Sequence, residues 1–543
     1  NQTTNLEYNG DGRVTGKKAG NISYASYDYD DNGTLVSYSD SSGATVYTRN
    51  KLGFVTKIDF PNQKTVEFEY DANGNLVKTI YPDGMEVTNT PDAMNRIVKL
   101  EWGDQSVAFE YDAAGNLLSE TRSNSTSSIY TYNKDNQLLG VSHELSGNVF
   151  TGETATYSNG IVTSLQFRFL PEINAIPPPI LNLSSNHLNQ IDRSFFSQIS
   201  FPHDADGNMT AYIDKGNYMM SAGYTHDNLL SKLNTPDAVV SITYDAMRYP
   251  RKMVADGVPS WLYYDHKGRL LFETDAGGTV TVNYIYRSRR IVAALRSGET
   301  GFYHYSRNGH TLAITGTGGE VLNAYAYSTH GFLLGSQEQF PNRLTFLGAF
   351  GALKLDKNYI LTGARVYSVA LGRYLQRDPL GIVTGTNPYL YASNNPVAGI
   401  DPLGLSEETG TVNAQGLDPS SDNGYGTAGG TANPFDDDIP DRASEWEIAK
   451  TAISNTLDEF SEHPVADLLP DALGNPVSYY KAANHLANKE YGKALWQFMP
   501  FNNSIDWATG YLQEKTKFND PTKFSGLGIF GDFNKQQTFS CDL

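Results

Sequence analysis

The residues of this chain best suited to chemistry are two aspartates that share one short motif. Asp378 and Asp401 each open the sequence Asp-Pro-Leu-Gly, 23 residues apart, and Arg377 directly precedes the first of them. Two carboxyl groups held close together do not both ionise readily, so one can keep a proton while the other stays charged. The charged group can activate a water molecule, the protonated one can polarise a carbonyl, and the arginine can orient its neighbour. Asp-Pro is also a common turn dipeptide, so a purely structural interpretation stays open.

The elements that have to position these aspartates are strands. The 543 residues include 50 Gly, 35 Tyr and 25 Phe, and aromatic residues favour strands while glycine favours turns. A net charge of −19 argues against a general binder of nucleic acid or of anionic membranes, because those partners need a positive face. The single cysteine, Cys541, excludes an internal disulfide and a cysteine metal cluster. No run of 18 apolar residues occurs, which predicts no membrane-spanning helix, and we expect no metal and no cofactor.

A repeat of about 20 residues extends through the first 340 residues. Its consensus is Tyr-Asp-x-x-Gly-Asn, in which Asp and Asn cap their own backbone and Gly accepts a positive φ, so the consensus predicts a tight turn. The flanking residues alternate, and Val66, Phe68 and Tyr70 fall on one face. Each copy therefore predicts a β-hairpin that stacks edge to edge on its neighbours, with the tyrosines as packing residues. Fourteen copies are recognisable, and they begin at Tyr8, Tyr29, Arg49, Tyr70, Pro91, Tyr111, Tyr132, His203, Tyr224, Tyr244, Tyr264, Tyr286, Tyr305 and Tyr327.

An interruption at about residues 150–200 separates the first seven copies from the last seven. The gap between Tyr132 and His203 is 71 residues long, which is enough for three degenerate repeats or for one inserted loop. Three consecutive prolines, Pro177–Pro179, exclude a central strand at that point. Both interpretations remain open.

The repeat and the segment around the two aspartates resemble the Rhs/YD-repeat family, which includes bacterial polymorphic toxins and the C subunits of insecticidal toxin complexes. Residues 361–405 are similar to the Rhs-associated core of that family, with Gly-Arg-Tyr, Arg-Asp-Pro-Leu-Gly, Asn-Pro-Tyr-x-Tyr, Asn-Asn-Pro and Asp-Pro-Leu-Gly-Leu in this order. The resemblance covers about residues 1–405. It implies a mainly β fold, in which antiparallel strands spiral into a hollow cocoon and the core segment plugs one end from inside.

The same resemblance implies that the chain cuts itself. Asp378 and Asp401 match the two essential aspartates of the family, and Arg377 matches the arginine beside the first. The implied scissile bond is Leu405–Ser406, and the segment after it is implied to be a variable payload held inside the shell. Fourteen repeats are few for a closed cocoon, so an N-terminal shell segment or a partner chain is expected to complete it. The resemblance further implies an immunity protein, a secretion machinery and export from the cell.

We therefore predict four parts: a repeat shell over residues 1–345, a core with the cleavage site over 346–405, a flexible linker over 406–440 and an effector domain over 441–543. The linker is rich in Gly, Ser, Thr, Asn and Asp, a composition that does not support a packed core. The apolar spacing over residues 441–516, interrupted by prolines, predicts a small and mainly α-helical domain.

The activity of the predicted effector is not evident from its residues. Residues 406–543 contain 21 acidic and 9 basic side chains, a net charge of −12, which disfavours a nuclease because nucleic-acid partners need a basic surface. His463 precedes a proline at a predicted helix end and is expected to be a charge partner of that end. His485 lies one helical turn from Lys481 and Lys489, which indicates a surface or packing role, and Cys541 has no partner base nearby in sequence. A membrane-active and a protein-binding effector both remain open. The alternative for the whole chain is a secreted or cell-surface interaction protein that releases no cargo.

Overall fold

The computed structural model describes residues 4–158, 161–168, 183–186, 188–194, 198–379, 387–405 and 408–409. The chain divides into two compact units, Asn1–Asp441 and Arg442–Leu543, and all described residues belong to the first. The predicted effector domain, and the predicted linker apart from the strand Glu408–Thr409, lie outside the described residues. Within the described ranges, no helix has the length and apolar character needed to cross a bilayer.

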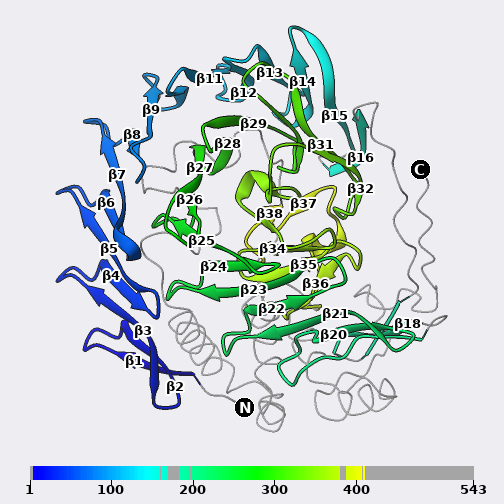
Figure 1. The fold of residues 1–543 in the computed structure, drawn as a ribbon. Coiled ribbons are helices and arrows are strands. Elements are labelled where there is room, and N and C mark those ends of the chain that lie inside the picture. Colours follow the sequence, from blue (N-terminus) through cyan, green and yellow to red (C-terminus); the bar gives the residue numbers. More distant parts are fainter. Residues whose placement is uncertain are drawn as a thin grey trace, which may run out of the picture. The chain divides into compact units, whose positions relative to one another are not determined.

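Two antiparallel sheets of 16 strands each make up most of the first unit, and within each sheet every strand pairs with its neighbours in sequence (Figure 1). The first sheet contains β1 (Thr4–Tyr8), β2 (Val14–Ala19), β3 (Ile22–Tyr29), β4 (Leu35–Asp40), β5 (Gly43–Arg49), β6 (Val55–Phe60), β7 (Lys64–Tyr70), β8 (Leu76–Ile80), β9 (Glu86–Pro91), β10 (Ile97–Trp102), β11 (Gln105–Tyr111), β12 (Leu117–Arg122), β13 (Thr126–Tyr132), β14 (Leu138–Leu145), β15 (Asn148–Ser158) and β16 (Ile161–Arg168). The second contains β17 (Leu183–Ser185), β18 (Ile191–Ser194), β19 (Ile199–Ser200), β20 (Ala211–Asp214), β21 (Asn217–Tyr224), β22 (Leu230–Asn234), β23 (Val239–Tyr244), β24 (Pro250–Ala255), β25 (Val258–Tyr264), β26 (Leu270–Thr274), β27 (Val280–Arg287), β28 (Arg290–Arg296), β29 (Glu299–Tyr305), β30 (Thr311–Thr315), β31 (Val321–Tyr327) and β32 (Leu333–Glu338). The mainly β fold class is thus confirmed.

Helical structure in the described part of the chain is limited to single 3₁₀ turns. Three of these turns are Pro61–Gln63, Gly348–Phe350 and Ala392–Asn394.

The predicted repeat turns form as expected. In 13 of the 14 copies the residue after the tyrosine position donates its backbone N–H to the carbonyl of the residue four positions later. In the copy at Tyr70, Asp71 Oδ1 also accepts hydrogen bonds from the backbone N–H of Asn73 and Asn75, at 2.9 Å each. Gly74 closes this turn with a φ of +86°, which is a left-handed conformation that glycine adopts without strain. The repeat sequence therefore specifies its own turn locally.

The repeat tyrosines donate hydrogen bonds to backbone carbonyls at or near the start of the preceding strand. The Tyr70 hydroxyl donates to the Val55 carbonyl at 3.0 Å, and Tyr224 and Tyr244 make the corresponding bonds to Met209 and Leu230. Each bond joins one hairpin to the preceding one, so it stabilises the pairing register as well as the core. The tyrosines are packing residues, as predicted.

Asparagine side chains link successive turns. Asn75 Nδ2 donates both to Asp71 Oδ2 at 2.8 Å and to Asn95 Oδ1 in the next turn at 2.9 Å. Asn95 occupies the left-handed position that Gly74 holds one repeat earlier, with a φ of +63°. The asparagine that replaces glycine therefore supplies the acceptor for the previous repeat.

Removing one tyrosine hydroxyl tests this stacking. The variant Tyr70→Phe should lower the free energy of unfolding by about 1 kcal/mol, because it deletes one partly buried hydrogen bond. Urea titration followed by tryptophan fluorescence measures this quantity. Tyr218→Phe, at a side chain that is 67% exposed, is the matched control and should have a smaller effect. Equal losses in the two variants would contradict the proposed contribution.

The interruption contains repeat-type structure where it is described. Strands β17, β18 and β19 pair in order with β20, so the second sheet begins before His203. Between β17 and β18, Asn186 Oδ1 accepts from the backbone N–H of Leu188 and Gln190, and Asn189 takes the left-handed position with a φ of +61°. Residues 186–190 are therefore a degenerate copy, with Asn in place of Asp. The three consecutive prolines lie outside the described residues.

Strands and turns of the second sheet pack against strands and turns of the first. Tyr27, Tyr38 and Tyr81 donate hydroxyl hydrogens to the Ala246 carbonyl, to Asp245 Oδ2 and to the Tyr284 carbonyl, at 2.5, 2.9 and 2.5 Å. The partners are separated by 203 to 219 residues in sequence. Apolar side chains from both sheets share one buried cluster, which includes Phe60, Phe68, Tyr263 and Phe272. Distant repeats thus become neighbours.

The segment after β32 is buried against the second sheet. It forms a four-stranded sheet of β33 (Leu353–Lys354), β34 (Tyr359–Thr362), β35 (Arg365–Ser368) and β36 (Arg373–Tyr374), followed by the pair β37 (Gly399–Ile400) and β38 (Glu408–Thr409) (Figure 1). Leu361, Val366 and Leu375 belong to the same buried cluster as Leu262 and Tyr284 of the second sheet. The segment that carries both aspartates is therefore held on a packed surface.

Candidate active site

One guanidinium group connects the two aspartates. Arg365 Nη2 lies 3.0 Å from Asp378 Oδ2 and 2.9 Å from Asp401 Oδ2. The Nε atom of the same side chain donates to the Gly404 carbonyl at 2.6 Å, and Nη1 donates to the Pro388 carbonyl at 3.1 Å. Arg365 and Asp401 are each 2% exposed and Asp378 is 7% exposed. Arg365 thus joins both carboxyl groups to the backbone next to Leu405.

The second motif forms a turn around Asp401. Asp401 Oδ1 accepts the backbone N–H of Leu405 at 2.9 Å, while Oδ2 accepts the Tyr374 hydroxyl at 2.9 Å. The Arg365 guanidinium carbon stands 3.7 Å from the centre of the Tyr374 ring, which is a cation–π contact. Burial, followed by the nearby Asp401 charge, raises the pKa of Tyr374 well above its ordinary value, so its hydroxyl stays a donor.

The chain between the two aspartates returns through a buried tyrosine segment. Residues 380–386 lie outside the described part of the chain. The structure describes residues 387–405, which lead to Asp401 and Leu405. Tyr389 and Tyr391 are 2% and 1% exposed, and the Tyr391 ring lies 4.5 Å from that of Tyr367. Asn394 and Asn395 donate backbone N–H groups to the carbonyls of Tyr391 and Ala392 in a tight turn. Tyr389 and Tyr391 thus anchor the described part of this stretch, and a tight turn follows them.

The structure brings together only some of the residues singled out in the sequence. Asp378, Asp401 and Leu405 meet around Arg365. Arg377 is exposed, and its aliphatic stem lies against the turn at Gly207, where an added Cβ would stand 2.5 Å from Arg377 Cδ. Ser406, the residue after the predicted scissile bond, lies outside the described residues.

Sequence reasoning overlooked Arg365, although a signal was present. Arg365 opens the strand Arg-Val-Tyr-Ser, and Val366 and Tyr367 after it are buried. A charged residue in such a strand is rarely buried unless a group of opposite charge pairs with it. This pattern could have linked Arg365 to the two aspartates. Within the described ranges, no group of three or more His, Cys, Asp or Glu side chains has the arrangement of a metal site.

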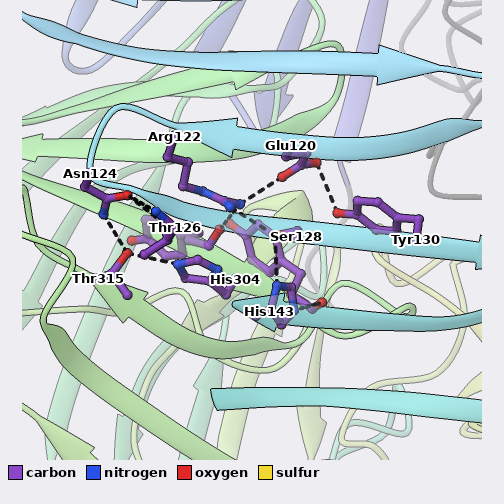
Figure 2. Close-up of polar contacts among 11 residues, drawn as sticks. Glu120, Arg122, Asn124, Thr126, Ser128, Tyr130, His143, His304 and Thr315 are labelled. Atoms are coloured by element: carbon purple, nitrogen blue, oxygen red, sulfur yellow. Dashed lines mark hydrogen bonds and ion pairs between the residues drawn. The ribbon is translucent and has the colours of Figure 1, made fainter. Parts of the chain in front are cut away.

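A second buried polar cluster joins the two sheets (Figure 2). Arg122 pairs with Glu120 at 2.9 Å and donates to Ser128 Oγ at 3.0 Å and to the Tyr303 carbonyl at 3.0 Å. Ser128 Oγ lies 2.8 Å from His143 Nδ1, which resembles a nucleophile and its base. Both residues have no exposed surface, and His143 Nε2 faces the Tyr305 carbonyl at 2.9 Å. We therefore assign this cluster to the contact between the sheets and not to catalysis.

The fold defines a class of protein: hairpins of a Tyr-Asp repeat, stacked in large antiparallel sheets with a buried terminal segment, form a YD-repeat shell. Residues 1–90 match the family model of the teneurin YD-shell. The crystal structure of TcdB2-TccC3-Cdc42 has a TM-score of 0.56 to this chain at 14% identity, over 74% of this chain and 26% of that one. This likeness concerns the fold.

Two relatives align with most of the chain. A tRNA3(Ser)-specific nuclease WapA from Bacillus spizizenii is 27% identical over 392 residues, which is 68% of this chain and 16% of the relative. The double-stranded DNA deaminase toxin A from Burkholderia cenocepacia is 21% identical over 456 residues, which is 70% of this chain and 30% of the relative. The chain therefore spans less than a third of the length of either relative. These findings confirm the resemblance to the Rhs/YD-repeat family that the motifs indicate.

Proposed function

We propose that this chain is the shell and self-cleaving core of an Rhs-type toxin, which encloses its C-terminal segment and releases it by cutting the Leu405–Ser406 bond. The observation that carries the proposal is the contact of Arg365 with both aspartates and with the Gly404 carbonyl. This contact puts two carboxyl groups beside the peptide that precedes Leu405.

The names of the relatives support a carrier with exchangeable cargo. One relative is named for tRNA cleavage and the other for deamination of double-stranded DNA, yet each aligns with about two thirds of this chain. A shared shell with different activities attached explains both alignments. On this proposal the cargo of this chain is residues 406–543, with residues 406–440 as linker and 441–543 as effector. Export from the producing cell and a protective immunity protein belong to the same proposal.

A surface or secreted interaction protein is the second candidate. The exposed apolar side chains Ile22, Leu52 and Met94 of the first sheet favour it, because such groups can contact a partner. This candidate needs no cleavage, so fragment release separates the two.

The full chain tests the proposal directly. After expression, a denaturing gel should show wild type as two bands, and mass spectrometry should find that the smaller fragment begins at Ser406. Asp378→Asn keeps the shape of the side chain and removes its titratable group, so this variant should stay whole. Asp275→Asn, at a carboxylate in the turn between β26 and β27, is the matched control and should be cut like wild type. A wild-type chain that stays whole, or equal cutting of wild type and Asp378→Asn, would refute the proposal.

A further inference from the structure

The turn at Asp401 shares two hydrogen bonds with the repeat turns. Asp401 Oδ1 accepts the N–H of the residue four positions later at 2.9 Å, as Asp71 Oδ1 does from Asn75 at 2.9 Å. Gly404 has a φ of +65° and donates to the Asp401 carbonyl at 3.4 Å, and Gly74 makes the same contact with Asp71 at 3.1 Å. The cleavage motif therefore repeats a shell turn at the end of the shell.

The second oxygen of Asp401 has different partners. In the repeats this oxygen binds the side chain four residues on, as Asp265 Oδ2 binds Arg269 Nε at 2.6 Å. The residue in that position after Asp401 is Leu405, whose side chain has no donor. Arg365 Nη2 and the Tyr374 hydroxyl replace it, each at 2.9 Å. The carboxylate thus accepts hydrogen bonds at both oxygens, which favours its charged form and fixes its orientation.

The turn itself is clamped onto the hairpin between β34 and β35. The Leu403 carbonyl accepts the Ala364 N–H at 2.9 Å, and a Cβ added at Gly363 would stand 2.7 Å from the same oxygen. A Cβ added at Gly404 would stand 2.7 Å from Thr362 Oγ1. The peptide before Leu405 therefore has little freedom to move while Asp401 holds the turn.

Asp378 comes from another segment. Its backbone N–H donates to the Pro388 carbonyl at 2.9 Å, and its Oδ2 meets the same Arg365 nitrogen as Asp401 Oδ2. The carboxyl of Asp378 thus lies beside the clamped turn without being the residue that forms it.

From this geometry we infer that the two aspartates have different roles, an assignment that rests on the proposed self-cleavage. Asp401, Arg365 and Tyr374 are positioning residues: they hold the Leu405 peptide in a repeat-type turn and exchange no proton. Asp378 is the catalytic carboxylate. It takes a proton from a water molecule whose oxygen bonds to the Leu405 carbonyl carbon. It then gives that proton to the Ser406 nitrogen as the carbon–nitrogen bond breaks, which leaves a carboxyl and an amine.

The rate of cutting and its pH dependence test the assignment. Full-length chains, labelled in a short pulse of cell-free translation, are transferred to buffers from pH 5 to pH 8, and the cut fraction is followed with time. The set comprises wild type, Asp378→Asn, Asp401→Asn, Tyr374→Phe and the double variant Asp401→Asn with Arg365→Gln. In the double variant an amide pair replaces the charged pair, and the amide introduced at position 401 can donate to the amide introduced at position 365.

We expect Asp378→Asn to be slowed by about 1,000-fold or more, as for loss of a general base. Tyr374→Phe should be slowed by about tenfold, as for one hydrogen bond to a charged group, with the pH midpoint of wild type. The double variant should recover about tenfold of the rate lost in Asp401→Asn, because it restores a hydrogen-bonded pair.

Two results would overturn the division of roles alone: a shifted midpoint in Tyr374→Phe, or Asp401→Asn as inactive as Asp378→Asn with no recovery in the double variant. An uncut wild type would overturn the proposed function together with this assignment.

Discussion

Replacing Arg365 with Gln should lower the free energy of unfolding by about 3–5 kcal/mol, the usual cost of leaving a buried charge unpaired. Arg365 is the cation that meets both Asp378 and Asp401. All three side chains are at least nine-tenths buried, so water cannot replace the guanidinium. The same variant should slow fragment release, because two buried carboxylates then lose the cation that contacts both of them.

Urea unfolding followed by fluorescence measures the stability of Arg365→Gln, and a denaturing gel measures its cleavage. Arg13→Gln is the control, because the ion pair of Arg13 with Asp11 is solvent-exposed at 3.4 Å. Exposed pairs of this kind contribute about 1 kcal/mol at most, and this variant should be cut like wild type. A loss in Arg365→Gln as small as that in Arg13→Gln would mean that the buried carboxyls do not depend on Arg365.

Acid should weaken the contact between the two sheets through its buried histidines. Burial, followed by the nearby Arg122 guanidinium, lowers the pKa of His143 to about 3. Burial also lowers the pKa of His304 well below its ordinary value, and the two rings lie 5.1 Å apart. The folded protein therefore leaves both rings neutral, with His143 facing Ser128 and the Tyr305 carbonyl and His304 facing Thr315.

The direction in which the free energy of unfolding changes with pH follows from proton uptake. Below pH 6.5 the unfolded chain binds protons at these histidines that the folded protein does not, so unfolding becomes more favourable as the pH falls. Each histidine contributes about 1.4 kcal/mol for each pH unit well below 6.5, and the pair removes roughly 4–5 kcal/mol between pH 6.5 and 4.5. Glu153 acts in the opposite direction, because burial raises its pKa to about 7 and its protonation stabilises the folded state as the pH falls.

A variant isolates one histidine from these opposing groups. Gln can retain hydrogen bonds to Ser128 and the Tyr305 carbonyl without titrating, so His143→Gln is the test variant. Between pH 6.5 and 4.5 its free energy of unfolding should gain about 2 kcal/mol relative to wild type, measured by urea titration at each pH. His226→Gln, at an exposed histidine, should run parallel to wild type. If the free energy of unfolding depends on pH in the same way in wild type and His143→Gln, the expected proton uptake by His143 on unfolding is contradicted.

The repeat fold could be predicted from the sequence because its determinants are local. Asp71, Gly74 and Asn75 lie within five residues, and their hydrogen bonds close within the same turn. The alternation of Val66, Phe68 and Tyr70 fixes which face of the strand is buried. The degenerate turn at 186–190 escaped notice because Ser185, Asn186 and Asn189 together replace the Tyr, Asp and Gly of the consensus.

The candidate site was only half evident from the sequence. The two Asp-Pro-Leu-Gly motifs indicated Asp378 and Asp401, and a resemblance indicated Arg377, which is adjacent in sequence. The tertiary structure instead brings Arg365 to both carboxyls, because the pairing of β35 with β34 and β36 turns its side chain toward the return from Pro388 to Leu405.

Contacts between repeats about 200 residues apart could likewise not be predicted from the sequence. Short-range patterns determined the hairpins and their turns. Which charge meets which carboxylate, and which histidine is buried between sheets, depended on how distant hairpins pack, and no local pattern encodes that packing.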